Sequence, residues 1–252
     1  MLDCRFLERS PTRRLDVTPD LTVRVFLRGS TAIVAMRVGQ RPLHRRAYKV
    51  ATGPGTLHPP LAAALTTLAG PLDGATVLDP FCGDGTLAIE AALRWPSARV
   101  AASDIDPERL DNTRANAARA GVDITVARAD AGDLGTRASA VDLLLTNPPW
   151  NVSVTSQASL RSSVYGFWST AADLLQRSGR TCTVTDSDLD VPGFLDHGGY
   201  RLGLCTRLRV AGRIVHVVLA GRPGGQVAEL APELGSWRAE AIRAGVVTEH
   251  GF

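Results

Sequence analysis

The pattern of hydrophobic and polar positions predicts strands and helices that alternate over most of this chain. Short apolar runs predict the strands, and apolar positions at helical spacing, bounded by prolines or glycines, predict the helices between them. The predicted strands are 75–79, 98–103, 123–128, 140–146 and 180–185, and the predicted helices are 57–70, 85–94, 107–120 and one near 157–177. Because alternating strands and helices build parallel sheets covered on both faces, the chain is predicted to have a doubly wound α/β fold.

Hairpin patterns flank this alternating segment. Residues 21–27 and 31–38 alternate apolar and polar positions around a turn at Gly29, which predicts a small N-terminal β-hairpin appendage. Residues 200–209 and 213–220 predict a C-terminal antiparallel hairpin. This hairpin extends the mostly parallel sheet to seven strands.

The remaining patterns complete a three-part division of the chain. A short segment at 188–197 and a helix near 235–244 are predicted outside the main alternation. The predicted parts are a basic β-hairpin and linker (1–56), a ligand-binding α/β domain (57–222) and a tail with a short helix (223–252).

Composition narrows the class of protein. The chain has 252 residues, of which 44% are hydrophobic and 21% are charged, as is typical of a folded globular domain with an appendage. No run approaches the ~20 apolar residues of a membrane span, and the first residues lack the design of a secretory signal. The four cysteines are too scattered for a metal site or a disulfide framework. We expect a cytoplasmic protein without a metal, and the sequence does not predict its oligomeric state.

Charge is distributed unevenly along the chain. Residues 1–56 carry eleven basic and four acidic side chains, a net charge of +7, whereas the remainder carries seventeen and twenty-one, a net charge of −4. A basic arm on a mildly acidic body favours contact with a polyanion such as RNA. A solvated arginine-rich face is the alternative, and it stays open.

The densest basic cluster lies at residues 40–49. Arg41, Arg45 and Arg46 could grip phosphates, and Tyr48 could stack on a base. Equally, Leu43 and Tyr48 could only anchor a linker to the core. The sequence does not decide between these interpretations.

A glycine turn follows the first predicted strand of the α/β segment. Residues 77–86 read Val-Leu-Asp-Pro-Phe-Cys-Gly-Asp-Gly-Thr and lead directly into a helical run. Glycines let the backbone approach a ligand closely, and a helix N-terminus offers unpaired N–H groups. The turn therefore suits a nucleotide-like ligand, although a tight turn between two core elements has the same pattern.

Four successive strand ends carry a polar residue. Asp79 precedes the glycine turn, and Asp104, about 20 residues past the glycines, can take both hydroxyls of a ribose while Ile105 lies against a purine. Asp130 can accept from an exocyclic amine, and Asn147 follows the fourth strand. Acids and asparagines often cap turns, but four at the same edge of one sheet predict a ligand site.

The segment Asn147-Pro148-Pro149-Trp150 decides between candidate ligands. A nicotinamide cofactor tolerates the glycine pattern but does not require this loop. The Asn147 side-chain oxygen and the Pro148 carbonyl could accept both N–H bonds of an exocyclic amine and turn its lone pair toward a methyl group. The prolines stiffen the loop, and Trp150 could stack on the ring that carries the amine. Positioning then does most of the work, without a strong general base.

Together these segments resemble the class I S-adenosylmethionine-dependent methyltransferases. The resemblance rests on residues 78–86 with Ile89-Glu90-Ala91-Ala92, on Ser103-Asp104-Ile105-Asp106 and on residues 147–150. It is greatest to the RNA guanine-N2 methyltransferases that carry a THUMP domain, because residues 41–48 and the helix from Leu57 resemble the segment that joins the two domains there. The match runs from about residue 21 to residue 220.

The resemblance implies a Rossmann-like methyltransferase fold with S-adenosyl-L-methionine as cofactor. Asp79, Gly83 and Gly85 would hold its methionine end, Asp104 its ribose and Asp130 its adenine amine. The whole predicted cofactor-binding set is Asp79, Phe81, Cys82, Gly83, Gly85, Thr86, Asp104, Ile105, Asp130 and Asn147. The predicted catalytic set is Asn147, Pro148 and Trp150, and the predicted substrate-binding set is Arg41, Arg45, Arg46, Tyr48 and Trp150.

The sequence departs from that family in two places. The roughly 20 residues ahead of the first hairpin are too few for a THUMP module, and Asn151-Val152-Ser153 lacks the glycine common after the aromatic residue.

The first hypothesis is methylation of an exocyclic amine of RNA, the N2 of a guanine in tRNA or rRNA. The second is N-methylation of a small amine or amide metabolite or natural product. Protein glutamine and DNA adenine methylation rank lower, and the intact acids and Asn147 disfavour a non-enzymatic RNA-binding protein.

Overall fold

The computed structural model describes residues 22–37, 44–70, 74–134, 141–150 and 164–245. It divides into two compact units, residues 1–43 and residues 44–252. The three-part division at residues 56 and 222 stays a prediction. Within the described residues, none of the helices is both long and apolar enough to span a membrane.

The first unit contains one antiparallel hairpin. Strands β1 (Thr22–Arg28) and β2 (Thr31–Arg37) pair in the register Val23↔Met36, Val25↔Val34 and Leu27↔Ala32, around Gly29 at a φ of 57°. These six residues share one face because side chains alternate along a strand. The predicted N-terminal hairpin is confirmed.

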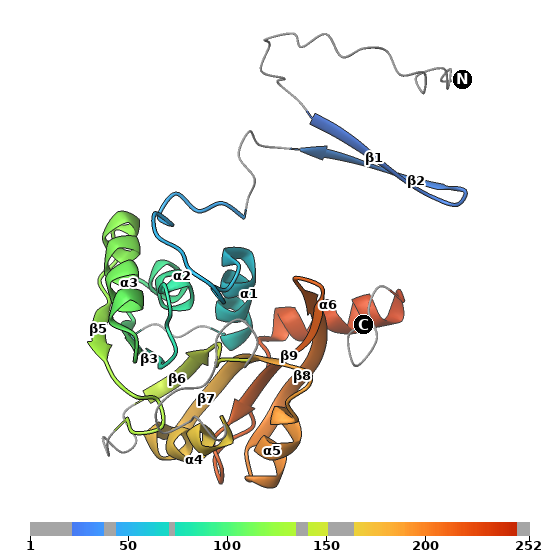
Figure 1. The fold of residues 1–252 in the computed structure, drawn as a ribbon. Coiled ribbons are helices and arrows are strands. Elements are labelled where there is room, and N and C mark those ends of the chain that lie inside the picture. The colour runs from blue at the N-terminus through green and yellow to red at the C-terminus, as the bar shows by residue number, and fades with distance from the viewer. Residues whose placement is uncertain (1–21, 38–43, 71–73, 135–140, 151–163, 246–252) are drawn as a thin grey trace. The chain divides into compact units, whose positions relative to one another are not determined.

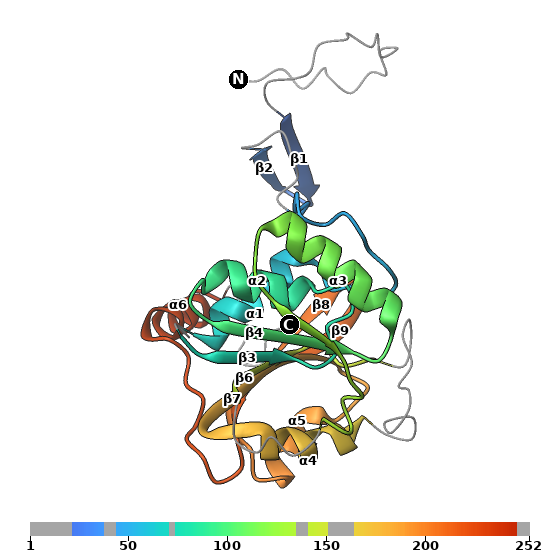
Figure 2. The same ribbon diagram turned by 90° about the vertical axis from the view of Figure 1, so that its left-hand side faces the viewer.

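The second unit is built around a seven-stranded sheet with the strand order β5-β4-β3-β6-β7-β9-β8 (Figures 1 and 2). The first five strands in chain order run parallel, and β9 is antiparallel to both of its neighbours. The strands are β3 (Thr76–Asp79), β4 (Arg99–Asp104), β5 (Thr125–Arg128), β6 (Val141–Thr146), β7 (Leu175–Asp186), β8 (Arg201–Val210) and β9 (Arg213–Gly221). The predicted doubly wound, mostly parallel sheet with an antiparallel terminal hairpin is confirmed.

Helices cover both faces of this sheet (Figure 2). One layer consists of α1 (Pro59–Ala69), α2 (Thr86–Arg94) and α3 (Pro107–Ala120). The other consists of α4 (Tyr165–Leu174) and α5 (Val191–His197), and α6 (Pro232–Arg243) follows the last strand. Strand β6 shows how two layers bury a strand completely: Leu143 and Leu145 join the first layer's core, whereas Leu144 joins the second layer's core.

The helix predicted near 157–177 is wrong at its C-terminal end. Helix α4 ends at Leu174, and Leu175 already belongs to β7, where it pairs with Val141. Leu175 is fully buried in the same core cluster as Leu174, and the chain continues there as a strand of the sheet. The first residues of that predicted helix lie outside the described part of the chain.

Candidate active site

A cleft of about 1100 Å³ opens at the carboxyl edge of the sheet. Loops that follow β3, β4, β5 and β6 line it, together with residues 54–61 and the turn between β8 and β9. The carboxyl ends of parallel strands meet at one edge, and β8 runs in the same direction as β7, so its turn reaches this edge too. The sheet therefore gathers the polar strand ends that the sequence singled out.

Asp79 is a buried acid of the cleft, with 1% of its surface exposed. Its Oδ1 atom accepts from the Phe81 N–H at 3.3 Å, whereas its Oδ2 atom has no partner among the described residues. Burial raises the pKa of this carboxyl well above its usual range, against the hydrogen bond from Phe81, and the charge of Asp104 raises it further. A cationic ligand group is the partner that would let Asp79 ionise.

This raised pKa makes a prediction about stability. A carboxyl with a raised folded-state pKa contributes stability that is fully present below its unfolded pKa of about 3.9 and is lost as the pH rises through the folded value. Asp79→Asn removes this loss, so the stability of the variant relative to the wild type should rise by about 1 kcal/mol or more between pH 5 and pH 8. Chemical unfolding at both pH values measures the difference. Asp123→Asn, at an exposed site, is the control, and an unaltered pH dependence in Asp79→Asn would contradict the assignment.

The glycine turn forms the floor of the cleft. Gly83 has a φ of 52°, and its N–H donates to Asp104 Oδ2 at 2.9 Å, while the Asp106 N–H donates to Asp104 Oδ1 at 3.0 Å. Asp104 is thus fixed between the turn and the start of α3 while it still lines the cleft. Burial raises the pKa of the Cys82 thiol, so that it stays protonated and serves as packing.

The predicted cofactor residues come together, with one exception. All of them line the cleft apart from Gly85, which lies directly behind it at a φ of 80°. A Cβ at Gly85 would lie 2.8 Å from Thr113 Cγ2, so this glycine allows the turn to pack on α3. At the far end of the cleft, Asp130 Oδ1 accepts from the Gly132 N–H at 3.0 Å.

The loop after β6 supplies an unpaired acceptor. The Asn147 Oδ1 atom is buried and has no hydrogen-bond partner among the described residues, and the same holds for the Trp150 Nε1 atom. Trp150 is partly buried and packs against the first layer's core, and Pro148 is buried. A buried acceptor without a partner costs free energy, and Asn147 differs from the unpaired core hydroxyls in that it also lines the cleft.

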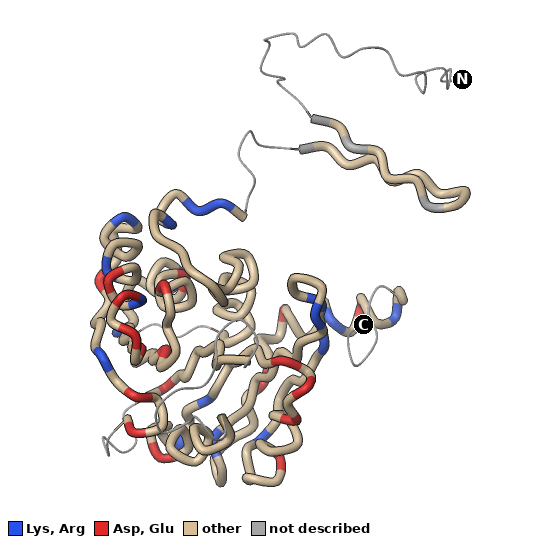
Figure 3. Tube along the Cα trace, viewed as in Figure 1, with Lys and Arg blue, Asp and Glu red and all other residues tan. Residues whose placement is uncertain are grey.

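The predicted substrate residues divide into three groups. Arg41 lies outside the described residues, and Arg45 is exposed. Three of the five residues 45–49 are basic (blue in Figure 3), but the Arg46 Nε atom donates to Glu90 Oε1 at 2.8 Å, and the Tyr48 hydroxyl donates to the same oxygen at 2.8 Å. Tyr48 is 5% exposed, and burial first and then Glu90 raise the pKa of its hydroxyl. Its position supports the anchoring interpretation, and its predicted stacking on a base has no support here.

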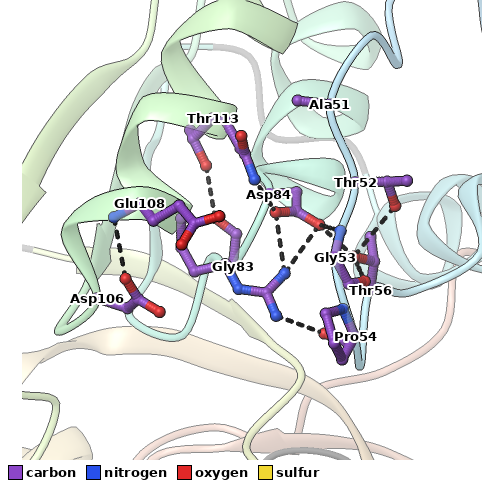
Figure 4. A network of polar contacts seen from close by, with 12 residues as sticks. Ala51, Thr52, Gly53, Pro54, Thr56, Gly83, Asp84, Asp106, Glu108 and Thr113 are labelled. Carbon is purple, nitrogen blue, oxygen red and sulfur yellow. Dashed lines mark hydrogen bonds and ion pairs between the residues drawn. The ribbon is translucent and has the colours of Figure 1, made fainter.

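Sequence reasoning missed a polar network beside the glycine turn (Figure 4). Asp84 is among the residues that line the cleft, and its carboxylate binds α3 and the chain segment at residues 53–56. Arg109 lines the cleft and binds this carboxylate. No spacing in the sequence signals these contacts, because their partners lie on segments that only the fold brings together. The same is true of the β8–β9 turn at the cleft.

Fold and site together define a Rossmann-like methyltransferase domain: a seven-stranded sheet with an antiparallel terminal hairpin, a glycine turn after β3 and an Asn-Pro-Pro-aromatic loop after β6. A family model supports this class. The chain belongs to the RMKL-like methyltransferase-domain family (UPF0020), whose model matches residues 46–203. Among the described residues, no group of three or more His, Cys, Asp or Glu side chains could hold a metal ion.

Two curated relatives are similar over most of this region. The chain is 39% identical over 169 residues to the tRNA (guanine(6)-N2)-methyltransferase of Thermus thermophilus, a match that covers 66% of this chain and 50% of the relative. It is 34% identical over 145 residues to the tRNA (guanine(10)-N2)-dimethyltransferase of Methanothermobacter thermautotrophicus, covering 57% and 42%. The chain therefore spans about half the length of the curated relatives that it matches.

Solved structures agree with the fold. The crystal structure of TrmN from Thermus thermophilus superposes with a TM-score of 0.67 at 34% identity, covering 81% of this chain and 60% of that one. SMU.472, solved in complex with SAH, superposes with a TM-score of 0.64 at 18% identity, covering 82% and 62%. The second match supports the fold alone.

Proposed function

We propose that this protein is an S-adenosylmethionine-dependent N-methyltransferase that acts on the exocyclic N2 amine of a guanine in RNA, with tRNA as the first candidate. The observation that carries the proposal is the unpaired Asn147 Oδ1 acceptor in a proline-stiffened loop at the cleft. The names of the two curated relatives, both tRNA guanine-N2 methyltransferases, support the choice of amine and of RNA.

The residues of the cleft fit the cofactor. The unpaired Asp79 Oδ2 atom is a partner for the ammonium group of its methionine part, and Asp104 is an acceptor for its ribose hydroxyls. Asp130, at the next strand end, would accept from the adenine amine, with Ile105 against the ring. When bound, S-adenosylmethionine supplies an electrophilic methyl group on a positively charged sulfur.

The acceptor loop would activate the amine by position. The Asn147 side-chain oxygen and the Pro148 carbonyl each accept one N–H bond of the amine, which draws its lone pair out of conjugation with the ring. Trp150 offers an aromatic face to the same ring. The methylated amine then carries an extra proton that is acidic enough to pass to water, so these residues orient the substrate without acting as bases.

A labelling experiment tests the proposed function. The purified protein is incubated with tritiated S-adenosylmethionine and unmodified tRNA transcripts, total RNA or a metabolite extract, and the products are digested to nucleosides. We expect label in N2-methylguanosine. If label is found only in the metabolite extract, the substrate is a small amine and not RNA. If no fraction is labelled, the proposal is wrong. The cytoplasmic location stays a prediction.

RNA binding should depend strongly on salt, because contacts with phosphates release condensed cations. We expect the Arg41→Gln/Arg45→Gln variant to bind tRNA more weakly and to lower the slope of log affinity against log salt by about 1–2. Filter binding across a salt series measures the slope. Arg201→Gln is the control. Arg201 is exposed, but it lies at the start of β8, at the edge of the sheet opposite the cleft. Equal slopes for the wild type and the double variant would exclude this arm as the RNA contact.

A further inference from the structure

Residues 46–58, here called the strap, are fixed to the rest of the second unit by side-chain contacts with distant segments. Near its start, Arg46 and Tyr48 both donate to Glu90 of α2. In its middle, the Asn116 side chain of α3 accepts from the Val50 and Ala51 N–H groups at 2.9 and 3.0 Å and donates to the Ala51 carbonyl at 2.9 Å. The strap therefore has a defined path over α2 and α3.

Its last part is held by the Asp84 carboxylate (Figure 4). Asp84 Oδ2 accepts from the Gly53 N–H at 2.7 Å and from the Thr56 hydroxyl. From α3, Arg109 Nη1 donates to both carboxylate oxygens at 3.0 and 3.1 Å, and Asn112 donates to Oδ1 at 2.9 Å. Arg109 Nη2 also donates to the Pro54 carbonyl at 2.8 Å, which ties the strap to α3 a second time.

This carboxylate is a strong and buried acceptor. The Asp84 side chain is fully buried, and 16% of the Arg109 side chain is exposed. Burial by itself would raise the pKa of Asp84, but the donors from Thr56, Asn112, Gly53 and Arg109 outweigh it and lower this pKa. Breaking such a pair leaves a buried charge without its partner, so the arrangement is held firmly.

Asp84 and Arg109, here called the clamp, join two walls of the cleft through their contacts with each other and with residues 53–56. Gly83 and Thr86, on either side of Asp84 in the chain, line the wall formed by the glycine turn. Residues 54–58 line the wall formed by the strap. We propose that Asp84 and Arg109 are positioning residues that set the cofactor site by holding the strap against the glycine turn. This proposal deepens the proposed function and rests on it.

A double-mutant cycle tests the proposal. In Asp84→Asn, Arg109→Gln and the double variant, S-adenosylmethionine binding, measured by calorimetry, should weaken by about tenfold. The loss of affinity in the double variant should be smaller than the two single losses combined, because both changes break the same Asp84–Arg109 contact. At saturating cofactor, methyl transfer should stay near the wild-type rate, since neither side chain belongs to the acceptor loop.

Two further variants serve as comparisons. Arg114→Gln removes an exposed ion pair with Asp111 on the same helix and should leave cofactor affinity unchanged. Gly53→Ala keeps both clamp residues, but its Cβ would overlap the Arg109 guanidinium and displace it. It should weaken cofactor binding in the same direction as Arg109→Gln. Because the backbone of Gly53 lies outside the left-handed region, alanine adds no strain of its own.

The outcomes separate the two proposals. A wild-type protein that binds no S-adenosylmethionine overturns the proposed function itself. If the wild type binds it, and the clamp variants bind it equally well while their melting temperatures fall, the clamp only stabilises the fold and the inference is wrong. Weaker binding in Asp84→Asn, Arg109→Gln and Gly53→Ala, with Arg114→Gln unchanged, confirms it.

Discussion

Asn147→Ala should lower the rate of methyl transfer by about 10²–10³-fold or more while the affinity for S-adenosylmethionine stays within about twofold of the wild-type value. The variant loses a side-chain acceptor of the loop, and the structure leaves that oxygen buried and unpaired among the described residues. A ground-state contact with the cofactor would instead affect binding. Rate and affinity together therefore decide which role the residue has.

The measurement is a single-turnover assay with tritiated cofactor and the RNA or small-molecule substrate that accepts label, paired with calorimetric binding of S-adenosylmethionine. Asn147→Asp is the informative comparison, because it keeps an oxygen acceptor at the same position and should retain more activity than Asn147→Ala. Alanine at this position should also relieve the cost of the unpaired oxygen, so the melting temperature should not fall. Full activity in Asn147→Ala would refute the acceptor mechanism.

The sheet and its strand ends could be predicted because each depends on short-range patterns. Asp79, Asp104, Asp130 and Asn147 each follow an apolar run, and parallel strands place such ends at one edge regardless of the details of packing. The turn of the last hairpin is equally local: Ala211 and Gly212 have φ values of 48° and 87°, which matches a tight turn between paired strands.

The strap and its clamp could not be predicted, because their contacts join residues far apart in the chain. Asp84 and Thr56 are 28 residues apart, and Val50 and Asn116 are 66 residues apart. An acid inside a glycine turn is also consistent with ligand binding, yet the Asp84 carboxylate accepts hydrogen bonds from Gly53 and Thr56 of the strap. For the same reason the role of Tyr48 could not be predicted. An aromatic residue in a basic segment suits stacking on a base, but the Tyr48 hydroxyl donates to Glu90 and anchors the strap to α2.

The boundary of α4 shows a different limit. The sequence predicts a helix as far as residue 177, but Leu175 pairs with Val141 in the sheet and the helix ends at Leu174. Propensity is a weak preference that sheet pairing overrides. The boundary therefore depends on the neighbouring strand, which a local pattern cannot represent.

Asp104→Ala should weaken S-adenosylmethionine binding by about 10–100-fold, the loss expected for hydrogen bonds to a charged acceptor. The effect has two sources, since Asp104 lines the cleft and also accepts from the Gly83 and Asp106 N–H groups. Fragments of the cofactor identify the subsite. If Asp104 holds the ribose, the variant should lose affinity for S-adenosylmethionine, S-adenosylhomocysteine and adenosine by similar factors.

Asp79→Asn provides the contrasting pattern, because the unpaired Asp79 Oδ2 atom is assigned to the amino group at the other end of the cofactor. This variant should weaken S-adenosylmethionine and S-adenosylhomocysteine binding and leave adenosine binding unchanged. Calorimetry with the three ligands on both variants gives six affinities, and competition measures any value too weak to titrate. If Asp104→Ala binds adenosine as the wild type does, the ribose assignment is wrong, and if Asp79→Asn loses adenosine, the orientation of the cofactor along the cleft must be reversed.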